Sequence, residues 1–228
     1  MLVAFETREA LMAAAADRLA EALQNGVTTR GAACAALSGG STPEPAYRLL
    51  AQKPLHWANI TFALVDERFV DPSDPASNQS MLERVLAPAL AQGATLKPMY
   101  FAASNAAEAA QRASAAYKDL HYDIALMGMG EDGHTASWFP GSEGLGAALS
   151  SSTAAPVVAV HASAAAGSPE RLTLTGAEIA KADHVLLLIT GAAKRAKLEA
   201  ALKGPAEAAP VAALFEPPLP APEVFWAP

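Results

Sequence analysis

The segment GMGEDGH, residues 128–134, ends in an aspartate and a histidine separated by one glycine. A carboxylate two residues before an imidazole can orient the ring or stabilise its protonated form, the usual arrangement for general acid/base catalysis. Asp132 and His134 are therefore candidate catalytic residues. A loop histidine that bonds a nearby carbonyl would have the same local sequence, so the pair alone leaves both interpretations open.

The same segment contains the GxGxxG spacing of dinucleotide-binding loops, over residues 128–133. Such a loop requires a long helix directly after it and an acidic residue about 20 positions later, which binds the ribose. Here Pro140 and Gly141 interrupt any helix, and no carboxylate occurs between Glu143 and Glu170. We therefore reject NAD binding by this loop and expect no cofactor.

A second segment, SGGSTP at residues 38–43, has the composition of an anion-binding loop. Two glycines allow the backbone to approach a ligand closely, hydroxyl groups add donors, and a helix starting at the proline exposes free N–H groups. The lysine of a P-loop is missing, and a plain strand-to-helix turn is the alternative. The candidate binding residues are Gly39, Gly40, Ser41 and Thr42.

Charged residues stand at the ends of other predicted elements. Asp66, Glu67 and Arg68 follow directly after an apolar run. Strand-like alternation sends Asp66 and Arg68 to one side and Glu67 to the other, although a surface Asp–Arg pair explains the same residues equally well. Arg171 and Lys194 are further candidates for binding an anion, since arginine can hold a phosphate through two hydrogen bonds. Alone, each of them is better explained by a solvated surface charge.

Other common catalytic signatures do not occur in the sequence. Its single cysteine, Cys34, lies inside an apolar run, so neither an internal disulfide nor a cysteine-rich zinc site is expected. The motifs GxSxG and HExxH are missing, so the sequence supports neither a serine nucleophile nor a metal site. The remaining chemistry is water activation or proton transfer on an anionic small molecule.

The motifs lie between strand-like apolar runs and alanine-rich helical runs. We expect strands at residues 31–38, 61–65, 96–101, 123–129, 157–161, 171–175 and 184–190. We expect helices at residues 7–24, from 43 onward, and at 78–91, 105–120 and 192–203. Thr7 is expected to cap the first helix and Gly26 to end it. The proline-rich tail from Pro210 onward is expected to form a short strand and a surface extension.

This alternation predicts one α/β domain over residues 1–228, with a mostly parallel sheet covered by helices on both faces. Ligands of such sheets bind beyond the carboxyl ends of the strands. The segments SGGSTP, DER, GMGEDGH and TGAAKR each follow a predicted strand. Their common location predicts a single site.

The composition limits the partners that the chain can have. Lys plus Arg number 16 and Asp plus Glu number 23, which gives a formal net charge of −7. This acidic balance argues against nucleic acid and against anionic membrane surfaces. No apolar run reaches the roughly 18 residues of a transmembrane helix. The first residues lack a basic region and are interrupted by acidic side chains, so we expect no signal peptide and a cytoplasmic protein.

Five segments, in chain order, resemble the signature segments of the 6-phosphogluconolactonase family. They are SGGSTPEPAY (38–47), DERFVDPSDPASN (66–78), GMGEDGHTASWFP (128–140), RLTLT (171–175) and TGAAKR (190–195). The resemblance spans about residues 5–205 and extends to the related glucosamine-6-phosphate deaminases. It implies a modified Rossmann-like sheet and a DGH loop of the kind that both groups share.

Two positions depart from these family patterns. The deaminases have a glutamate five residues after the loop histidine, where this chain has Phe139. This departure favours the lactonases over the deaminases. Trp138 stands where the lactonases usually have a smaller aliphatic residue, and we expect it to reshape the pocket wall without changing the chemistry.

The resemblance implies hydrolysis of 6-phospho-D-glucono-1,5-lactone to 6-phospho-D-gluconate in the oxidative pentose phosphate pathway, without a metal ion. It implies that His134 activates a water and that Asp132 supports the imidazole. The oxyanion would be held by Arg68 or by backbone N–H groups of residues 39–42, although Arg68 could serve the phosphate instead. Asp66 would bind a substrate hydroxyl. The phosphate would be bound by Ser41, Thr42, Arg171 and Lys194.

Two alternatives remain at this point. The nearest alternative enzyme is a sugar-phosphate deaminase or aldose–ketose isomerase, against which Phe139 argues. A non-catalytic sugar-phosphate sensor is the alternative from another class, although the segment before SGGSTP is too short for an added DNA-binding module. We expect the sugar-phosphate lactone as the only partner, and a monomer or weak homodimer.

Overall fold

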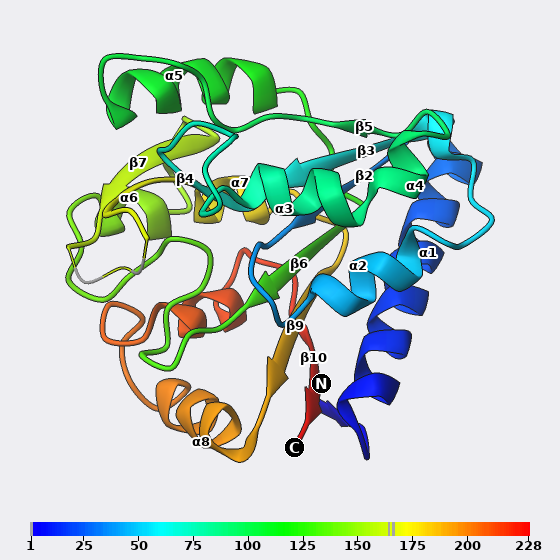
Figure 1. Cartoon of the computed structure of the whole chain (residues 1–228). Helices are drawn as coiled ribbons and strands as arrows, with labels where there is room; N and C mark the ends of the chain where they lie inside the picture. The colour runs from blue at the N-terminus through cyan, green and yellow to red at the C-terminus, as the bar shows by residue number, and fades with distance from the viewer. Residues whose placement is uncertain (1, 164, 166) are drawn as a thin grey trace.

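The computed structural model describes residues 2–163, 165 and 167–228. Within these residues, seven strands form one parallel sheet in the order β1-β10-β9-β6-β2-β3-β5 (Figure 1). They are β1 (Leu2–Ala4), β2 (Ala33–Leu37), β3 (Ile60–Leu64), β5 (Thr95–Leu96), β6 (Ile124–Gly128), β9 (Val185–Thr190) and β10 (Glu223–Ala227). The strands β2, β6 and β9 are apolar and almost entirely buried, as is typical of a sheet covered on both faces.

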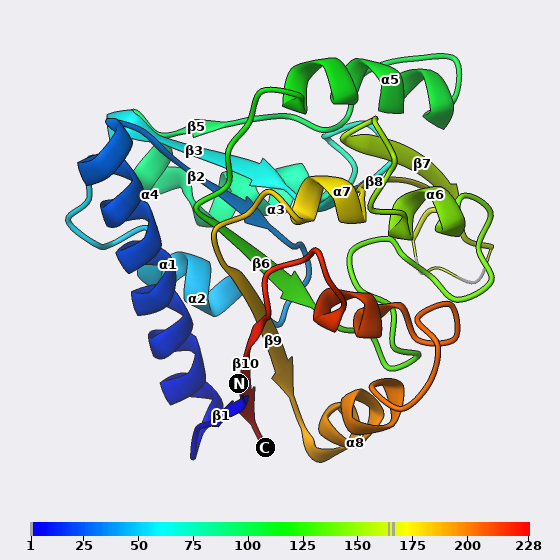
Figure 2. The same cartoon turned by 180° about the vertical axis from the view of Figure 1, so that it is seen from behind.

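Helices lie on both sides of this sheet. The helices α2 and α3 lie in front of it in Figure 1, and α7 lies in front of it in the reverse view of Figure 2. The α-helices are α1 (Arg8–Arg30), α2 (Glu44–Leu50), α3 (Asn78–Val85), α4 (Ala87–Leu90), α5 (Ala106–Tyr117), α6 (Leu145–Leu149), α7 (Gly176–Ile179) and α8 (Ala192–Ala201), with 3-10 helices η1 (Trp57–Asn59) and η2 (Pro210–Phe215). The predicted α/β class is therefore confirmed. No helix among the described residues combines the length and apolar character needed to cross a bilayer.

A second, antiparallel sheet corrects part of the prediction. Its strands, in spatial order, are β4 (Asp66–Arg68), β8 (Glu170–Leu174) and β7 (Val157–His161). Residues 66–68 therefore form a separate strand and are not the end of the preceding one. The strands predicted at 157–161 and 171–175 belong to this antiparallel sheet and not to the parallel sheet. Residues 162–169 connect β7 and β8, and this connection is too short for the crossover that parallel neighbours require.

The first helix is longer than predicted. Thr7 caps it as expected, since its Oγ1 accepts a hydrogen bond from the N–H of Ala10 at 3.1 Å. The prediction that Gly26 ends the helix is wrong: the end is Gly31, which has φ 80°. Gly26 is needed for packing, because a Cβ on it would lie 1.9 Å from Oδ1 of Asp123.

The C-terminal strand β10 lies inside the parallel sheet, between β1 and β9. Val224, Phe225 and Ala227 are buried there, so the short strand predicted in the tail is confirmed. The expected surface extension holds for residues 216–221, which are exposed or half-buried, but not for the largely buried 3-10 helix η2 before them. The strand β1, which is short and exposed at the edge of the sheet, was not predicted from the sequence. The strand predicted at 96–101 stops at Leu96, shortly before a proline that has no N–H for a ladder.

Candidate active site

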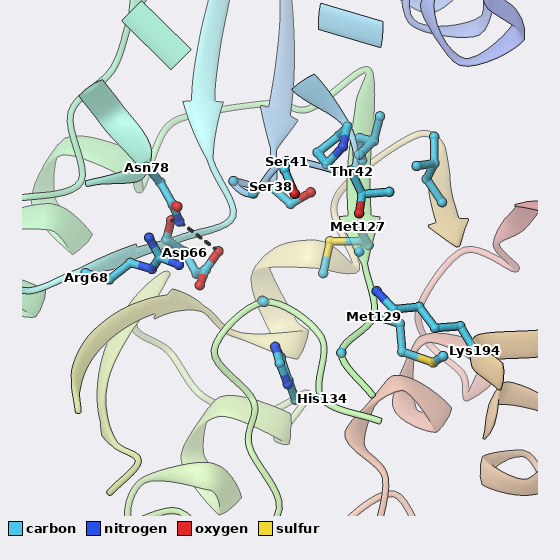
Figure 3. A pocket seen from close by; sticks show the side chains of 18 residues that line it. Ser38, Ser41, Thr42, Asp66, Arg68, Asn78, Met127, Met129, His134 and Lys194 are labelled. Carbon is cyan, nitrogen blue, oxygen red and sulfur yellow. Dashed lines mark hydrogen bonds between the residues drawn. The ribbon is translucent and has the colours of Figure 1, made fainter. Parts of the chain in front are cut away.

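A cavity of about 270 Å³ opens where β2, β3, β6 and β9 end (Figure 3). Sites for small ligands begin near this size. The loops after these four strands are far apart in the chain, but they meet here because parallel strands end at the same edge of a sheet. Eight of the ten predicted site residues line the cavity: Gly39, Gly40, Ser41, Thr42, Asp66, Arg68, His134 and Lys194.

Two glycines shape the loop after β2 for different reasons. Gly40 has φ 93°, a left-handed conformation that favours glycine. Gly39 makes room for a neighbour, because a Cβ on it would lie 1.9 Å from Oδ1 of Asn78. The hydroxyl of Tyr47 in α2 donates a hydrogen bond to the carbonyl of Ser38 at 2.8 Å. The start of the loop is therefore fastened to the helix that follows it.

Lys194 brings a positive charge to this loop. It reaches from the first turn of α8 into the cavity that the hydroxyl groups of Ser41 and Thr42 also line (Figure 3). Gly191 has φ 88° and lets the chain turn from β9 into α8. A cation and two hydroxyl donors together can hold a phosphate or carboxylate group.

His134 and Asp132 form a hydrogen-bonded pair. Oδ1 of Asp132 accepts a hydrogen bond from the backbone N–H of His134 at 3.0 Å and lies 2.6 Å from Nδ1 of its ring. Burial of Asp132 opposes its ionisation, but the hydrogen bonds from His134 outweigh this and hold the pKa of Asp132 below its ordinary value. With an ionised carboxylate at Nδ1, the other ring nitrogen, Nε2, is the one that can exchange a proton with a ligand.

Two glycines of the GxGxxG spacing shape the loop that contains this pair. A Cβ on Gly130 would lie 2.2 Å from the imidazole of His134, and Gly133 has φ 91°. In the described part of the chain, the next helix, α6, begins only at Leu145. The loop therefore departs from the geometry of a dinucleotide site, which has a helix directly after it.

Asp66 forms part of the cavity wall and is held by two neighbours. The hydroxyl of Ser137 donates a hydrogen bond to Oδ2 of Asp66 at 2.6 Å. The side-chain amide of Asn78 donates to the carbonyl of Asp66 at 2.9 Å. Asp66 is only 6 % exposed, so its carboxylate has a defined orientation towards the cavity.

Alternation along β4 places Arg68 in the cavity and Glu67 on the opposite side, as predicted. Arg68 donates a hydrogen bond to the carbonyl of Ala76, while its Nε is buried with no hydrogen-bond partner among the described residues. Glu67 is fully buried, and it accepts hydrogen bonds from the N–H groups of Asn78 and Gln79 at 2.7 Å each. Burial raises the pKa of Glu67, and these bonds oppose the rise. Glu67 thus fastens the start of α3 to β4.

Sequence reasoning missed several lining residues. Asn78 lines the cavity from the first turn of α3, and its position at the end of the family-like segment 66–78 was the available indication. Met127 and Met129 line the cavity at the end of β6 (Figure 3). They belong to an apolar run, so the sequence gives no reason to separate them from core residues.

Asp132 and Arg171 are the two predicted residues that do not line the cavity formed by the described residues. Arg171 lies opposite Arg68 in the pairing of β4 and β8. It is 3 % exposed, and burial lowers its pKa. Its Nε donates a hydrogen bond to the carbonyl of Ser168 at 2.7 Å. The role of Arg171 as a phosphate ligand therefore stays a prediction.

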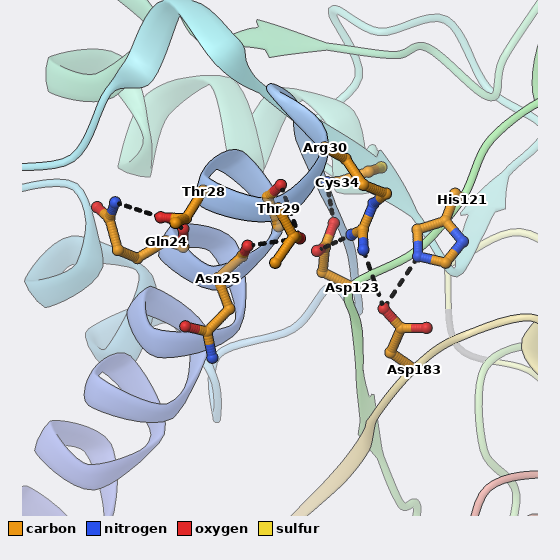
Figure 4. Close-up of polar contacts among 10 residues, drawn as sticks. Gln24, Asn25, Thr28, Thr29, Arg30, Cys34, His121, Asp123 and Asp183 are labelled. Carbon is orange, nitrogen blue, oxygen red and sulfur yellow. Dashed lines mark hydrogen bonds and ion pairs between the residues drawn. The ribbon is translucent and has the colours of Figure 1, made fainter.

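A separate cluster with metal-ligand side chains lies at the start of β6 and β9 (Figure 4). His121 Nε2 lies 2.9 Å from Oδ2 of Asp183, and Asp123 accepts a hydrogen bond from the N–H of Cys34 at 2.8 Å. Arg30 forms ion pairs with both aspartates. Its guanidinium supplies the positive charge that the carboxylates need, so the cluster ties the end of α1 to the sheet.

The fold and the cavity together define an α/β protein with a histidine–aspartate pair beside a loop rich in glycine and hydroxyl side chains. The family model described as "Glucosamine-6-phosphate isomerases/6-phosphogluconolactonase" matches residues 6–226. The chain belongs to this family.

Individual relatives agree with this assignment. A protein of Mesorhizobium japonicum named 6-phosphogluconolactonase is 39% identical over 227 residues, which cover 99% of this chain and 94% of that protein. A 6-phosphogluconolactonase of Caulobacter vibrioides is 37% identical, covering 99% of this chain and 97% of the relative. The crystal structure of a 6-phosphogluconolactonase from Shewanella baltica matches with a TM-score of 0.94 and 32% identity, covering 100% of this chain and 97% of that one.

Proposed function

We propose that the chain hydrolyses 6-phosphogluconolactone to 6-phosphogluconate in the oxidative pentose phosphate pathway. The observation that carries this proposal is the presence of His134 and Lys194 in one cavity. A phosphorylated lactone needs a proton acceptor at its ester and a cation at its phosphate. The relatives' names support the same reaction, and Phe139 occupies the position at which the deaminases have a glutamate.

In the proposed mechanism, Nε2 of His134 takes a proton from a water whose oxygen attacks the lactone carbonyl carbon. The tetrahedral intermediate then collapses, and the bond between this carbon and the ring oxygen breaks. The imidazolium returns its proton to the ring oxygen, which leaves as a hydroxyl group. Asp132 stays ionised throughout and stabilises the imidazolium through the hydrogen bond at Nδ1.

Charged groups on two sides of the cavity would position the substrate. Figure 3 draws Arg68 beside Asp66, across the cavity from Lys194. We assign the lactone end to Arg68 and Asp66, where the Arg68 guanidinium stabilises the oxyanion and the Asp66 carboxylate accepts a substrate hydroxyl. We assign the phosphate to Lys194 with Ser41 and Thr42. This scheme requires no metal ion, because the chain supplies both the base and the cations.

The test is a coupled assay in which glucose-6-phosphate dehydrogenase generates the lactone in situ. Formation of 6-phosphogluconate is followed against the spontaneous background, with the wild-type chain and with His134→Ala. We expect clear acceleration by the wild type, a loss of about 10²- to 10⁴-fold in the variant, and no acceleration with unphosphorylated gluconolactone. An unaccelerated reaction, or release of ammonia from glucosamine 6-phosphate, would contradict the proposal.

The cellular setting and assembly belong to the same proposal. We propose that the protein acts in the cytoplasm as a monomer or weak homodimer. Size-exclusion chromatography with light scattering at increasing concentrations measures this directly. A stable higher oligomer at micromolar concentration would contradict it.

A further inference from the structure

Phe139 contacts the proposed base directly. Its ring centroid lies 4.2 Å from that of the His134 imidazole, with an angle of 32° between the ring planes. The guanidinium carbon of Arg171 lies 5.5 Å from the centroid of the same phenyl ring. The phenyl ring thus touches both the proposed base and the predicted site arginine that lies outside the cavity.

The surroundings of Phe139 are unusual for a phenyl ring. Phe139 is half-buried. Within the described residues, its side chain neither belongs to the hydrophobic core nor packs against that core. Its ring instead contacts the imidazole of His134 and the guanidinium of Arg171. Burial in the core therefore does not explain the aromatic residue at this position.

The His134–Asp132 pair needs a second restraint. The hydrogen bond at Nδ1 holds the imidazole at one edge, but a bond at one edge leaves the ring able to tilt about it. The side chains of His134 and Asp132 are 30% and 49% exposed, so the cavity wall does not enclose them. A phenyl ring packed at an angle of 32° against the imidazole restrains the tilt and shields one side of the imidazole from water.

Phe139 is itself well anchored. The neighbouring Trp138 is fully buried, and its Nε1 donates a hydrogen bond to the carbonyl of Leu174 in β8 at 2.9 Å. On the other side, the hydroxyl of Ser142 donates to the carbonyl of Phe139 at 2.8 Å. Arg171 also belongs to β8. The antiparallel sheet therefore holds the backbone at Phe139 through Trp138 and supplies the cation that lies against the ring.

We propose that Phe139 is a positioning residue for His134. This inference rests on the proposed function, in which His134 is the general base. It gives a reason for the aromatic side chain at position 139 that packing in the core does not supply.

The first experiment compares Phe139→Leu with Phe139→Tyr in the full chain. Loss of the ring should lower kcat by about 10- to 100-fold, because misplacement of a catalytic group lowers the rate of the chemical step. KM should stay within about 2-fold, because the phosphate contacts are unchanged. Tyrosine keeps the ring face and should recover most of the loss. The NMR signal of the His134 Cε1 proton should shift in Phe139→Leu, since the ring current of the phenyl group is lost.

Phe5→Leu is the matched control. Phe5 is also half-buried, and its ring contacts that of Phe225 edge to face outside the cavity, with 5.1 Å between the ring centroids. This variant also removes a half-buried phenyl ring, but outside the cavity, and it should keep the wild-type kcat. A wild-type kcat in folded Phe139→Leu, or an equal loss in Phe5→Leu, would overturn the inference. An inactive wild type would instead refute the proposed function, so the two failures are distinguishable.

Discussion

Replacement of Asp132 by asparagine removes one charge beside the proposed base and keeps the shape of the side chain. In the wild type, the carboxylate would stabilise the imidazolium that forms when His134 takes the proton of water. A hydrogen bond to a charged group contributes about 1.5–3 kcal/mol. The two side chains are 30% and 49% exposed, so solvent screening favours the lower half of this range. A loss of about 1.5–2 kcal/mol corresponds to a decrease in kcat of about 10- to 30-fold.

The coupled lactone assay measures this effect. KM should change by less than about 2-fold in Asp132→Asn, because Asp132 supports His134 from outside the cavity lining. The pKa of Asp132 lies below its ordinary value of 3.8, so the wild-type residue is ionised at neutral pH. Any acid limb of the pH–rate profile near neutrality therefore belongs to another group and should persist in the variant.

Glu131→Gln is the matched control, because it removes the same charge from the adjacent, exposed residue. It should keep kcat within about 2-fold of the wild type. A wild-type kcat in Asp132→Asn would refute the reasoning about the imidazolium. An equal loss in Glu131→Gln would show that the net charge of the loop, and not the bonded pair, controls the rate.

Three further substitutions test other parts of the structure. Lys194→Met should raise KM by about 10- to 100-fold at nearly constant kcat, because it removes a charge-assisted hydrogen bond to the phosphate; steady-state kinetics measures this. Gly26→Ala should lower the free energy of unfolding in urea by about 1–2 kcal/mol, because the new methyl group overlaps Asp123. Glu44→Gln should lower the urea midpoint at pH 7, because hydrogen bonds from Arg84 hold the pKa of Glu44 below its ordinary value in the folded state.

The controls for these variants follow from the same contacts. Gly146→Ala places a methyl group on another helical glycine, with nothing within 4 Å of the new atom, and should not destabilise the protein. Equal losses in Gly26→Ala and Gly146→Ala would contradict the packing argument. A carboxylate whose folded pKa is lowered stabilises the protein above its unfolded pKa, and this contribution is lost as the pH falls through the folded value. The effect of Glu44→Gln should therefore shrink below pH 4.5, and a constant effect would contradict the linkage.

The local features of the chain were predictable from neighbouring residues. Thr7 caps the first helix, and Asn105 caps α5 through a hydrogen bond from the N–H of Glu108 at 3.0 Å. These contacts span a few residues, so the sequence contains both partners in one short segment. The same holds for Asp132 and His134, which form their pair within one loop.

The sequence by itself determined which side chains are available for chemistry, the order of the motifs and the α/β class. It did so because strand and helix periodicity, caps and the Asp132–His134 spacing are short-range properties. Only the tertiary structure decided that β7 and β8 form a second sheet, that Gly39 makes room for Asn78, and that Arg171 lies outside the cavity. These outcomes depend on contacts between residues far apart in the chain, which form only when burial of the apolar faces packs the elements together.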